Sequence, residues 1–172
     1  MKTIPWVDPF TNQPLEEKEE KLVSKDSEYS IIDGIPKFVK ENSDDPQYDI
    51  EKCFSYQWTE SDFGQPDKFS DDDIKKDVIE TMDLTDDDLS LFNDKIVLDV
   101  GVGSGASSRL WAPRAKEFHG VDIGNGVYRA KNTLKNSVEN PILSHSDLHH
   151  LPYPDESFDL IVSNGVLHHT PS

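Results

Sequence analysis

Alternating blocks of apolar and polar positions divide the second half of the chain into expected strands and helices. Short runs of β-forming residues recur between residues 96 and 172, separated by segments with helical spacing. One helix is expected to begin near Ser104 and end before Pro113, and a second to run from Val127 to Ser137. Such alternation is typical of an α/β fold with a parallel sheet and right-handed crossovers. The expected strands are residues 96–100, 117–122, 141–145 and 158–163.

The first 40 residues have a different pattern, rich in turn formers. Residues 29–32 and 35–39 are short apolar-rich runs that flank Asp33-Gly34. This pair suits a type I′ turn, in which both central residues have positive φ, so a β-hairpin is expected. Pro36 has no backbone N–H to donate, which places its strand at an edge. We expect residues 1–40 to form a small β module.

Residues 41–95 are expected to form an acidic helical linker or lid. Between residues 71 and 82 the apolar side chains recur at helical spacing and would line one face of a helix. Thr85, followed by acids at 86–88, is typical of a helix N-cap, because acids favour the positive end of the helix dipole. Two sets of apolar residues would anchor these helices: Ile74, Val78, Ile79 and Met82 in the first, and Leu89, Leu91 and Phe92 in the second.

Charge and composition exclude several classes of partner. The 172-residue chain has a formal net charge of -17, and residues 1–95 hold 26 of its 34 Asp and Glu residues. Such an acidic surface repels phosphate backbones, so nucleic acid is not expected as a partner. No apolar run reaches membrane-spanning length, the start of the chain does not resemble a signal peptide, and Cys53 is the single cysteine. We therefore expect a soluble, cytoplasmic protein without a membrane partner.

The run I-V-L-D-V-G-V-G-S-G at residues 96–105 carries the strongest chemical signal. β-Forming residues lead into Asp99, and glycines then alternate with other residues. Such a turn lets the backbone approach a ligand, and the following helix offers free N–H groups, although a tight structural turn would have the same pattern. The next expected strand ends in Asp122, where a carboxylate could accept hydrogen bonds from both hydroxyls of a ribose.

A nicotinamide dehydrogenase is one explanation of this pattern. Residues 101–106 satisfy G-x-G-x-x-A, and Asp122 lies at about the required distance. Asp99 argues against it, because a negative charge beside a pyrophosphate is unfavourable, whereas a ligand with a positive centre and an ammonium group suits it. Two further elements, Ser146-Asp147-Leu148 and residues 151–163, follow the third strand and lead through the fourth.

Together these elements resemble the class I S-adenosylmethionine-dependent methyltransferases, in the branch that acts on small molecules. Residues 97–105 look like the first motif of that family, and residues 151–169 resemble its L-P-[FY]-x-D-x-S-F-D-x-[IV] block and the following loop. The resemblance covers residues 96–172 and implies a Rossmann-like sheet, S-adenosylmethionine as cofactor and a small-molecule methyl acceptor. The cofactor-binding residues that it implies are Asp99, Gly101, Gly103, Gly105, Asp122, Ile123, Asp147, Leu148 and Asn164.

The resemblance also implies roles for these residues. The glycine turn would approach the methionine moiety, with Asp99 near its ammonium group, while Asp122 would hold the ribose and Asp147 the adenine amine. Backbone around Asn164 and Gly165 would flank the transfer site.

Histidines provide the remaining candidates for chemistry. Methyl transfer to an already nucleophilic atom needs no general base, so His168 and His169 are candidates only for an acceptor that must lose a proton. No metal site is expected, because the histidines near the strand ends lack a helical H-x-x-x-H pattern or a cysteine partner.

The N-terminal part resembles a zinc-ribbon-derived module that precedes the catalytic domain in some bacterial methyltransferases. The similar stretch is residues 15–39, but Asp8-Pro9-Phe10-Thr11 stands where that module has a C-P-x-C pair. The module is therefore expected to have lost its metal and to rest on a small apolar core. Residues 54–59 resemble the segment that enters the catalytic domain, and they could form a helix over the cofactor.

The family fold has seven strands in the order 3-2-1-4-5-7-6, and the chain contains only the first four. We expect a C-terminally truncated domain whose fourth strand is an exposed, apolar edge. The chain could be a truncated gene product, a fragment, or one copy of a homodimer completed through that edge. A non-catalytic remnant that binds the cofactor or a partner is the alternative function, and the dehydrogenase ranks last.

Overall fold

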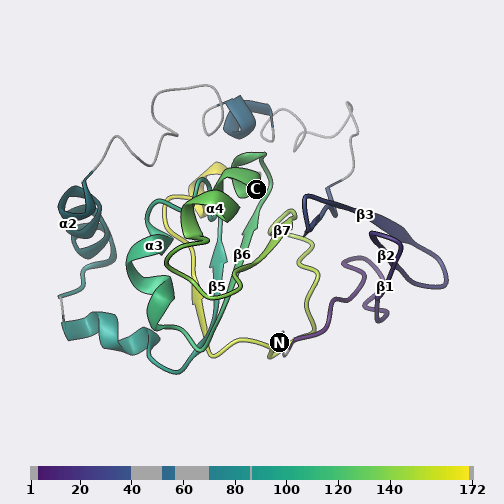
Figure 1. Ribbon diagram of the computed structural model, residues 1–172, viewed down its shortest axis with the longest axis horizontal. Coiled ribbons are helices and arrows are strands. Elements are labelled where there is room, and N and C mark those ends of the chain that lie inside the picture. Colours follow the sequence, from purple (N-terminus) through teal and green to yellow (C-terminus); the bar gives the residue numbers. More distant parts are fainter. Residues whose placement is uncertain (1–3, 40–51, 57–69, 86, 171–172) are drawn as a thin grey trace.

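The computed structural model describes residues 4–39, 52–56, 70–85 and 87–170. These residues form two four-stranded sheets, a small antiparallel sheet near the N-terminus and a parallel sheet that is flanked by helices (Figure 1). No helix among them has the length and apolar composition needed to cross a lipid bilayer.

The parallel sheet has the strand order β7-β6-β5-β8. Its strands begin and end within two residues of the expected ranges, and every neighbouring pair is parallel. The order places the first strand of the unit, β5, between β6 and β8, so the carboxyl ends of these three strands meet at one edge. The strands are β5 (Ile96–Val100), β6 (Glu117–Asp122), β7 (Ile142–His145) and β8 (Leu160–Val162).

The helix after β5 is shorter than its sequence pattern predicts. Helix α3 comprises only Ser108–Trp111, whereas a start near Ser104 was expected. The reason is the backbone of Gly105, whose φ of 76° is left-handed and cannot belong to a right-handed helix. A short 3₁₀ helix, η4 (Ala112–Arg114), follows and contains the expected helix breaker, Pro113.

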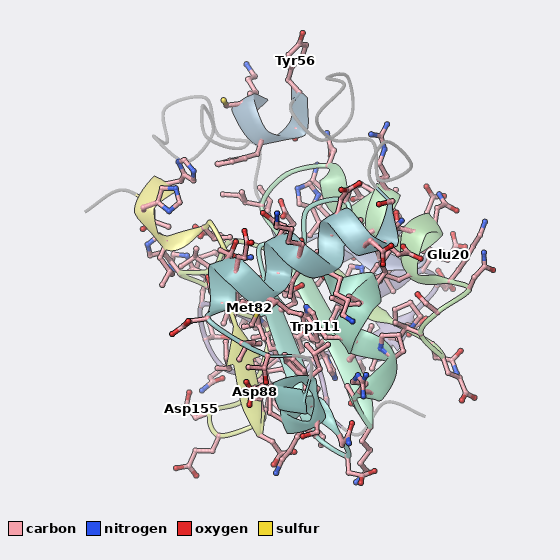
Figure 2. The ribbon with its side chains drawn as sticks, turned by 90° about the vertical axis from the view of Figure 1, so that its left-hand side faces the viewer. Glu20, Tyr56, Met82, Asp88, Trp111 and Asp155 are labelled. Carbon is pink, nitrogen blue, oxygen red and sulfur yellow. The ribbon has the colours of Figure 1, made fainter. Side chains whose placement is uncertain are left out.

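Helices α2 (Asp71–Met82), α3 and α4 (Gly126–Leu134) are the main helices around the parallel sheet (Figures 1 and 2). Helix α2 matches its predicted range and begins with a capping box formed by Ser70 and Asp73. Its Ile74 and Val78 belong to the apolar cluster that also contains side chains of β5, α3 and α4.

The second apolar segment of the linker is a 3₁₀ helix, η3 (Asp87–Phe92). Leu89 and Phe92 are buried as predicted, and the Phe92 ring stacks on Trp111 with ring centroids 4.6 Å apart. The prediction was wrong for Leu91, which is 37% exposed. In a 3₁₀ helix the side chains repeat every three residues, so Leu89 and Phe92 share a face that Leu91 does not.

The N-terminal module is a meander of antiparallel strands. Asp33 and Gly34 have φ values of 51° and 74°, as the predicted type I′ turn requires. Pro36 lies in β4, an edge strand of this sheet, and the next residue, Lys37, bridges in parallel to His145 of the other sheet. The meander consists of β1 (Glu16–Lys18), β2 (Lys21–Val23), β3 (Glu28–Ile32) and β4 (Ile35–Pro36).

The module and the parallel sheet share one apolar cluster. The Phe38 backbone N–H donates to the His145 carbonyl at 2.8 Å, which continues the contact between the module and β7. Trp6 packs against Phe38 and Tyr153, with ring centroids 5.8 and 5.1 Å apart. This cluster also contains Leu98 of β5, so the module covers the sheet face opposite α3 and α4.

Asp8 organises the turn at which the related module would have its first cysteine pair. Its carboxylate is 2% exposed and accepts from the backbone N–H groups of Phe10 and Thr11 at 2.9 and 2.8 Å. The Ser27 hydroxyl and the Tyr29 phenol also donate to it, the latter at 3.0 Å. Burial opposes ionisation, but these four hydrogen bonds outweigh it and lower the pKa of Asp8 to about 2.

Candidate functional site

The turn after β5 approaches two other elements at the carboxyl edge of the sheet. Gly101 has a φ of 84°, and a Cβ atom there would lie 2.1 Å from Cγ2 of Val166. The backbone N–H of Gly101 donates to the Val121 carbonyl at 2.8 Å, and that of Val102 donates to the same oxygen at 3.0 Å. Only glycine fits this position, both because of its backbone angle and because the loop after β8 lies against it.

Asp122 connects the turn after β5 to the loop after β6. One carboxylate oxygen accepts from the Gly103 N–H and the other from the Gly124 N–H, both at 2.7 Å. Burial raises the pKa of Asp122 to about 6, and these two hydrogen bonds limit the rise. A carboxylate has about four acceptor positions, so two remain for ligand hydroxyls.

Asp99 lies on the other side of the glycine turn. It is 6% exposed, and the Ser108 hydroxyl donates to its carboxylate. Burial raises the pKa of Asp99 to about 7; the hydrogen bond from Ser108 opposes this rise, and the nearby charge of Asp122 adds to it. A cationic ligand group beside Asp99 would favour its charged form.

Two adjoining cavities occupy this edge, and Gly101 and Asn164 line both of them. The first has a volume of about 80 Å³ and is lined by the acid that ends β6 and the acid that follows β7. The second, of about 90 Å³, contains Asp99 and is covered by Val78 and Met82 of α2. Six predicted site residues line the first cavity: Gly101, Asp122, Ile123, Asp147, Leu148 and Asn164.

Two of the predicted glycines do not line either cavity. The backbone N–H of Gly103 donates to the Asp122 carboxylate, so Gly103 helps to orient Asp122 without lining the cavity itself. A Cβ atom at Gly105 would lie 3.2 Å from Cα of Ala130 and 3.1 Å from Cγ of Leu134, both on α4. Gly105 therefore permits close packing of the turn on α4.

Asp147 has partners within its own loop. One carboxylate oxygen accepts from the backbone N–H of His149 at 3.0 Å and lies 3.0 Å from Nδ1 of the same residue. The other lies 3.7 Å from Nδ1 of His150. These contacts hold the carboxylate beside the cavity that Leu148 also lines.

The histidines near the strand ends have separate roles. His145 is fully buried, with Nε2 2.8 Å from the Ile123 carbonyl and Nδ1 3.2 Å from the Tyr128 hydroxyl. His169 lines the first cavity, and its ring centroid lies 3.9 Å from that of His168. Within the described parts of the chain, no three His, Cys, Asp or Glu side chains group closely enough to hold a metal ion.

A short helical segment, residues 52–56, is drawn at the top of Figure 1, apart from the labelled helices. Its Phe54 lines the first cavity, and the Phe54 ring meets that of His169 edge to face at 5.2 Å. The Asn125 N–H donates to Oγ of Ser55 at 2.9 Å. A Cβ atom at Gly124 would lie 3.1 Å from the Ser55 nitrogen, so glycine permits this approach.

This segment overlaps, at residues 54–56, the stretch 54–59 for which the sequence suggested a helix over the cofactor. Residues 57–59, which include Trp58, lie outside the described residues. The site residues expected from the sequence did not include five residues that line the first cavity: Val100, Val121, Ser146, Val166 and Thr170. Ser146 had a usable signal, because it directly precedes the predicted Asp147.

A family model described as a methyltransferase domain matches residues 98–172. Residues 98–172 belong to the class I S-adenosylmethionine-dependent methyltransferase family. The match begins inside β5 and covers the glycine turn, Asp122 and Asp147. It favours this family, whose cofactor is S-adenosylmethionine, over the nicotinamide dehydrogenases.

Similarity to individual proteins agrees with this family. Malonyl-[acyl-carrier protein] O-methyltransferase of Halorhodospira halophila is 39% identical over 73 residues, which are 41% of this chain and 25% of that protein. Protein arginine N-methyltransferase 1 of Schizosaccharomyces pombe is 34% identical over 101 residues, which are 55% of this chain and 30% of that protein. The chain therefore spans between a quarter and a third of the length of these relatives.

A solved structure has a similar fold. Magnesium protoporphyrin IX methyltransferase of Synechocystis PCC 6803, with bound S-adenosylmethionine, superposes with a TM-score of 0.52 at 19% identity. The similarity covers 77% of this chain and 67% of that one. It supports the α/β methyltransferase-like fold.

The residues present fit S-adenosylmethionine. The molecule is long, with an adenosine end and a cationic amino acid end, and the two adjoining cavities give it two differing environments. Asp122 offers two acceptor positions at one end, and Asp99 is a buried acid at the other. The turn between them has no side chain at Gly101, where a Cβ atom would clash with Val166.

Proposed function

We propose that this chain binds S-adenosylmethionine across the two cavities and supports methyl transfer to a small-molecule acceptor. The observation that carries the proposal is that Gly101 and Asn164 line both cavities, so a single elongated ligand could pass between them. When bound, the cofactor supplies an electrophilic methyl group on a positively charged sulfur.

The adenosine end fits the cavity lined by Asp122 and Asp147. Asp122 has two free acceptor positions for the ribose hydroxyls, and its backbone hydrogen bonds fix its orientation before the ligand arrives. Asp147 would accept from the adenine amine, and Leu148 would contact the base. Hydrogen bonds to a charged carboxylate contribute about 1.5–3 kcal/mol each.

The amino acid end fits the cavity beside Asp99. An ammonium group there would stabilise the charged carboxylate, whose ionisation is otherwise opposed by burial. Val78 and Met82 of α2 cover this end and exclude water. Figure 2 labels Met82, the last residue of α2, and Trp111 of α3, which both line this cavity.

The acceptor would enter beside Asn164, near the cover formed by Phe54 and His169. Most of the rate would come from aligning the acceptor with the methyl group and from excluding water. His169 lines the cavity and could receive a proton from a hydroxyl or amine acceptor. His168 does not line the cavity and contacts only the ring of His169 there. The acidic surface favours a small or neutral acceptor over nucleic acid.

A second candidate function is binding without turnover, or assembly with a partner. Strand β8 pairs only with β5 in the described sheet, and Ile161 is 59% exposed. An open strand edge of this kind can pair with another strand, either from a second copy or from a different chain. We also propose a cytoplasmic location, since the lone Cys53 is a free thiol that suits a reducing compartment.

Calorimetric titration with S-adenosylhomocysteine, and separately with NAD, tests the proposal. We expect saturable binding of the first ligand only, weakened at least tenfold by Asp122→Ala and unchanged by Asp155→Ala, a surface control outside both cavities. Circular dichroism would verify that each variant is folded. Equal weakening by both substitutions, or binding of NAD alone, would refute the assignment. Cofactor binding without turnover against any acceptor would favour the second function.

A further inference from the structure

His145 lies at the end of strand β7, between two loops that line the first cavity. Its side chain is 0% exposed. Nε2 of its ring lies 2.8 Å from the backbone carbonyl oxygen of Ile123, which follows Asp122 and lines the cavity. The next two residues after His145, Ser146 and Asp147, line the same cavity. One buried ring therefore joins the loop after β6 to the loop after β7.

The ring must donate a proton to this carbonyl oxygen. A carbonyl oxygen only accepts, so Nε2 of His145 carries a proton. Nδ1 lies 3.2 Å from the Tyr128 hydroxyl, which can donate to a bare ring nitrogen or accept from a protonated one. Of the three protonation states of the ring, only the neutral form with its proton on Nδ1 is incompatible with these contacts. The contact with Ile123 thus selects where the proton resides.

The rest of His145 is fixed by the elements around it. In the parallel register of β6 and β7, His145 pairs with Asp122. Its backbone carbonyl accepts from the N–H groups of Phe38 and Val39 in the N-terminal module, at 2.8 and 3.3 Å. Its ring packs edge to face on that of Tyr128 in α4, with ring centroids 5.6 Å apart. The Nε2–H group is therefore a donor in a fixed place, held by β6, the module and α4.

The loop after β6 is held by hydrogen bonds at successive residues. The Gly124 N–H donates to the Asp122 carboxylate at 2.7 Å, and the carbonyl of the intervening Ile123 accepts from His145. A carbonyl that loses its donor inside a protein is unfavourable, so without His145 this peptide group would shift toward another donor or toward water. Such a shift would move the Ile123 side chain within the cavity wall.

We propose that His145 is a positioning residue for cofactor binding. Its Nε2–H group holds the Ile123 carbonyl and thereby keeps the Ile123 side chain in the wall of the first cavity. His145 acts through Ile123 and does not line the cavity itself. This inference rests on the proposed function, because it assigns the adenosine end of the cofactor to this cavity.

Two substitutions of His145 separate the donor from the ring. Glutamine places its side-chain nitrogen near the position of Nε2 and can donate to Ile123, whereas leucine is of similar size and cannot donate. We expect His145→Leu to raise the Kd of S-adenosylhomocysteine about tenfold by calorimetric titration, and His145→Gln to raise it no more than about threefold. The same difference is expected with 5′-methylthioadenosine, which lacks the amino acid end, because Ile123 lines the first cavity and not the second.

His119 provides a matched control on the neighbouring strand β6. It is also 0% exposed, but its ring contacts Glu117 and Tyr153, neither of which lines the first cavity. His119→Leu should lower the free energy of unfolding without changing the Kd of the folded protein. Urea unfolding of every variant verifies that the titrations are made on folded protein.

The outcomes separate this inference from the proposed function. Failure of the native chain to bind either adenosine compound would refute both. Native binding that His145→Leu and His145→Gln leave unchanged, or weaken alike, would overturn the inference alone, as would an equal weakening by His119→Leu. Nitrogen-15 spectra of the native chain give a reading that does not depend on a variant. A proton on Nε2 of His145 is expected there, and a ring with its only proton on Nδ1 would overturn the inference.

Discussion

Replacing Gly101 with alanine tests the argument that the turn after β5 requires glycine for two separate reasons. The first is its φ of 84°, which costs an L-residue about 1–2 kcal/mol. The second is contact, because the new Cβ atom would lie 2.1 Å from Cγ2 of Val166. Forcing an extra methyl group into a packed site costs about 1–3 kcal/mol. Gly101→Ala should therefore lower the free energy of unfolding by about 2–5 kcal/mol.

Gly165 provides a matched control for the backbone contribution. It also has a positive φ, 69°, but no atom beyond its two neighbours in the chain lies within 4 Å of the position that its Cβ would take. Gly165→Ala should lower the free energy of unfolding by only about 1–2 kcal/mol. The difference between the two variants isolates the clash with Val166.

Equilibrium urea unfolding, followed by circular dichroism, measures these free energies. Adding Val166→Ala to Gly101→Ala removes Cγ2 and should recover most of the difference between the two glycine variants. The reasoning would be refuted if Gly101→Ala cost no more than Gly165→Ala. It would also be refuted if Val166→Ala lowered the stability of the alanine variant further.

Three more predictions concern stability. Folding lowers the pKa of Asp8 from 3.8 to about 2, so its charged form stabilises the native state above pH 4, and this contribution is lost as the pH falls toward 2. Asp8→Asn should lower the free energy of unfolding, measured with urea, by about 2 kcal/mol at pH 7 and should remove that acid dependence. Folding raises the pKa of Asp99 and Asp122 to about 7 and 6, so their contribution to stability is greatest below pH 4 and declines as the pH rises through 6 to 7. Asp99→Asn should flatten the decline of Tm over this range, and an unchanged slope would contradict the raised pKa of Asp99. Leu89→Ala should cost about 2–5 kcal/mol and Leu91→Ala less than about 1, because Leu89 is 2% exposed and Leu91 37%; similar losses would argue against the 3₁₀ register.

Local patterns were sufficient to predict the parallel strands and helix α2. Each of these elements has a period that burial on one or both faces imposes, and α2 also has its capping signal at Ser70. The start of α3 could not be predicted in the same way. Helical spacing begins at Ser104, but the left-handed backbone of Gly105 is set by its packing against α4.

The contact between the N-terminal module and the parallel sheet also could not be predicted from the sequence pattern. The hairpin at Asp33-Gly34 is local and was predicted, whereas the bridge from Lys37 to His145 joins positions 108 residues apart. Nothing in the periodicity of either segment specifies that pairing. The same is true of Asp8, whose partners Ser27 and Tyr29 lie about twenty residues later, just before and within β3.

Some residues of the candidate site could be predicted from the sequence and others could not. Asp122 and Asp147 could be predicted because acids that follow parallel strands meet at one edge of the sheet. Gly103 and Gly105 share the glycine pattern with Gly101, yet only Gly101 lines the cavities. The spacing of the glycines predicts the tight turn. Which of them faces the cavities depends on contacts with elements that come later in the chain.

The central claim, that one cofactor spans both cavities, is tested most directly by an NMR titration of the chain with S-adenosylhomocysteine. The account predicts that the largest shifts of backbone amide signals occur at Gly101, Ile123 and Leu148 at one end and at Ser108 and Met82 at the other. Shifts confined to residues outside both cavities, or no shifts in a folded protein, would contradict it.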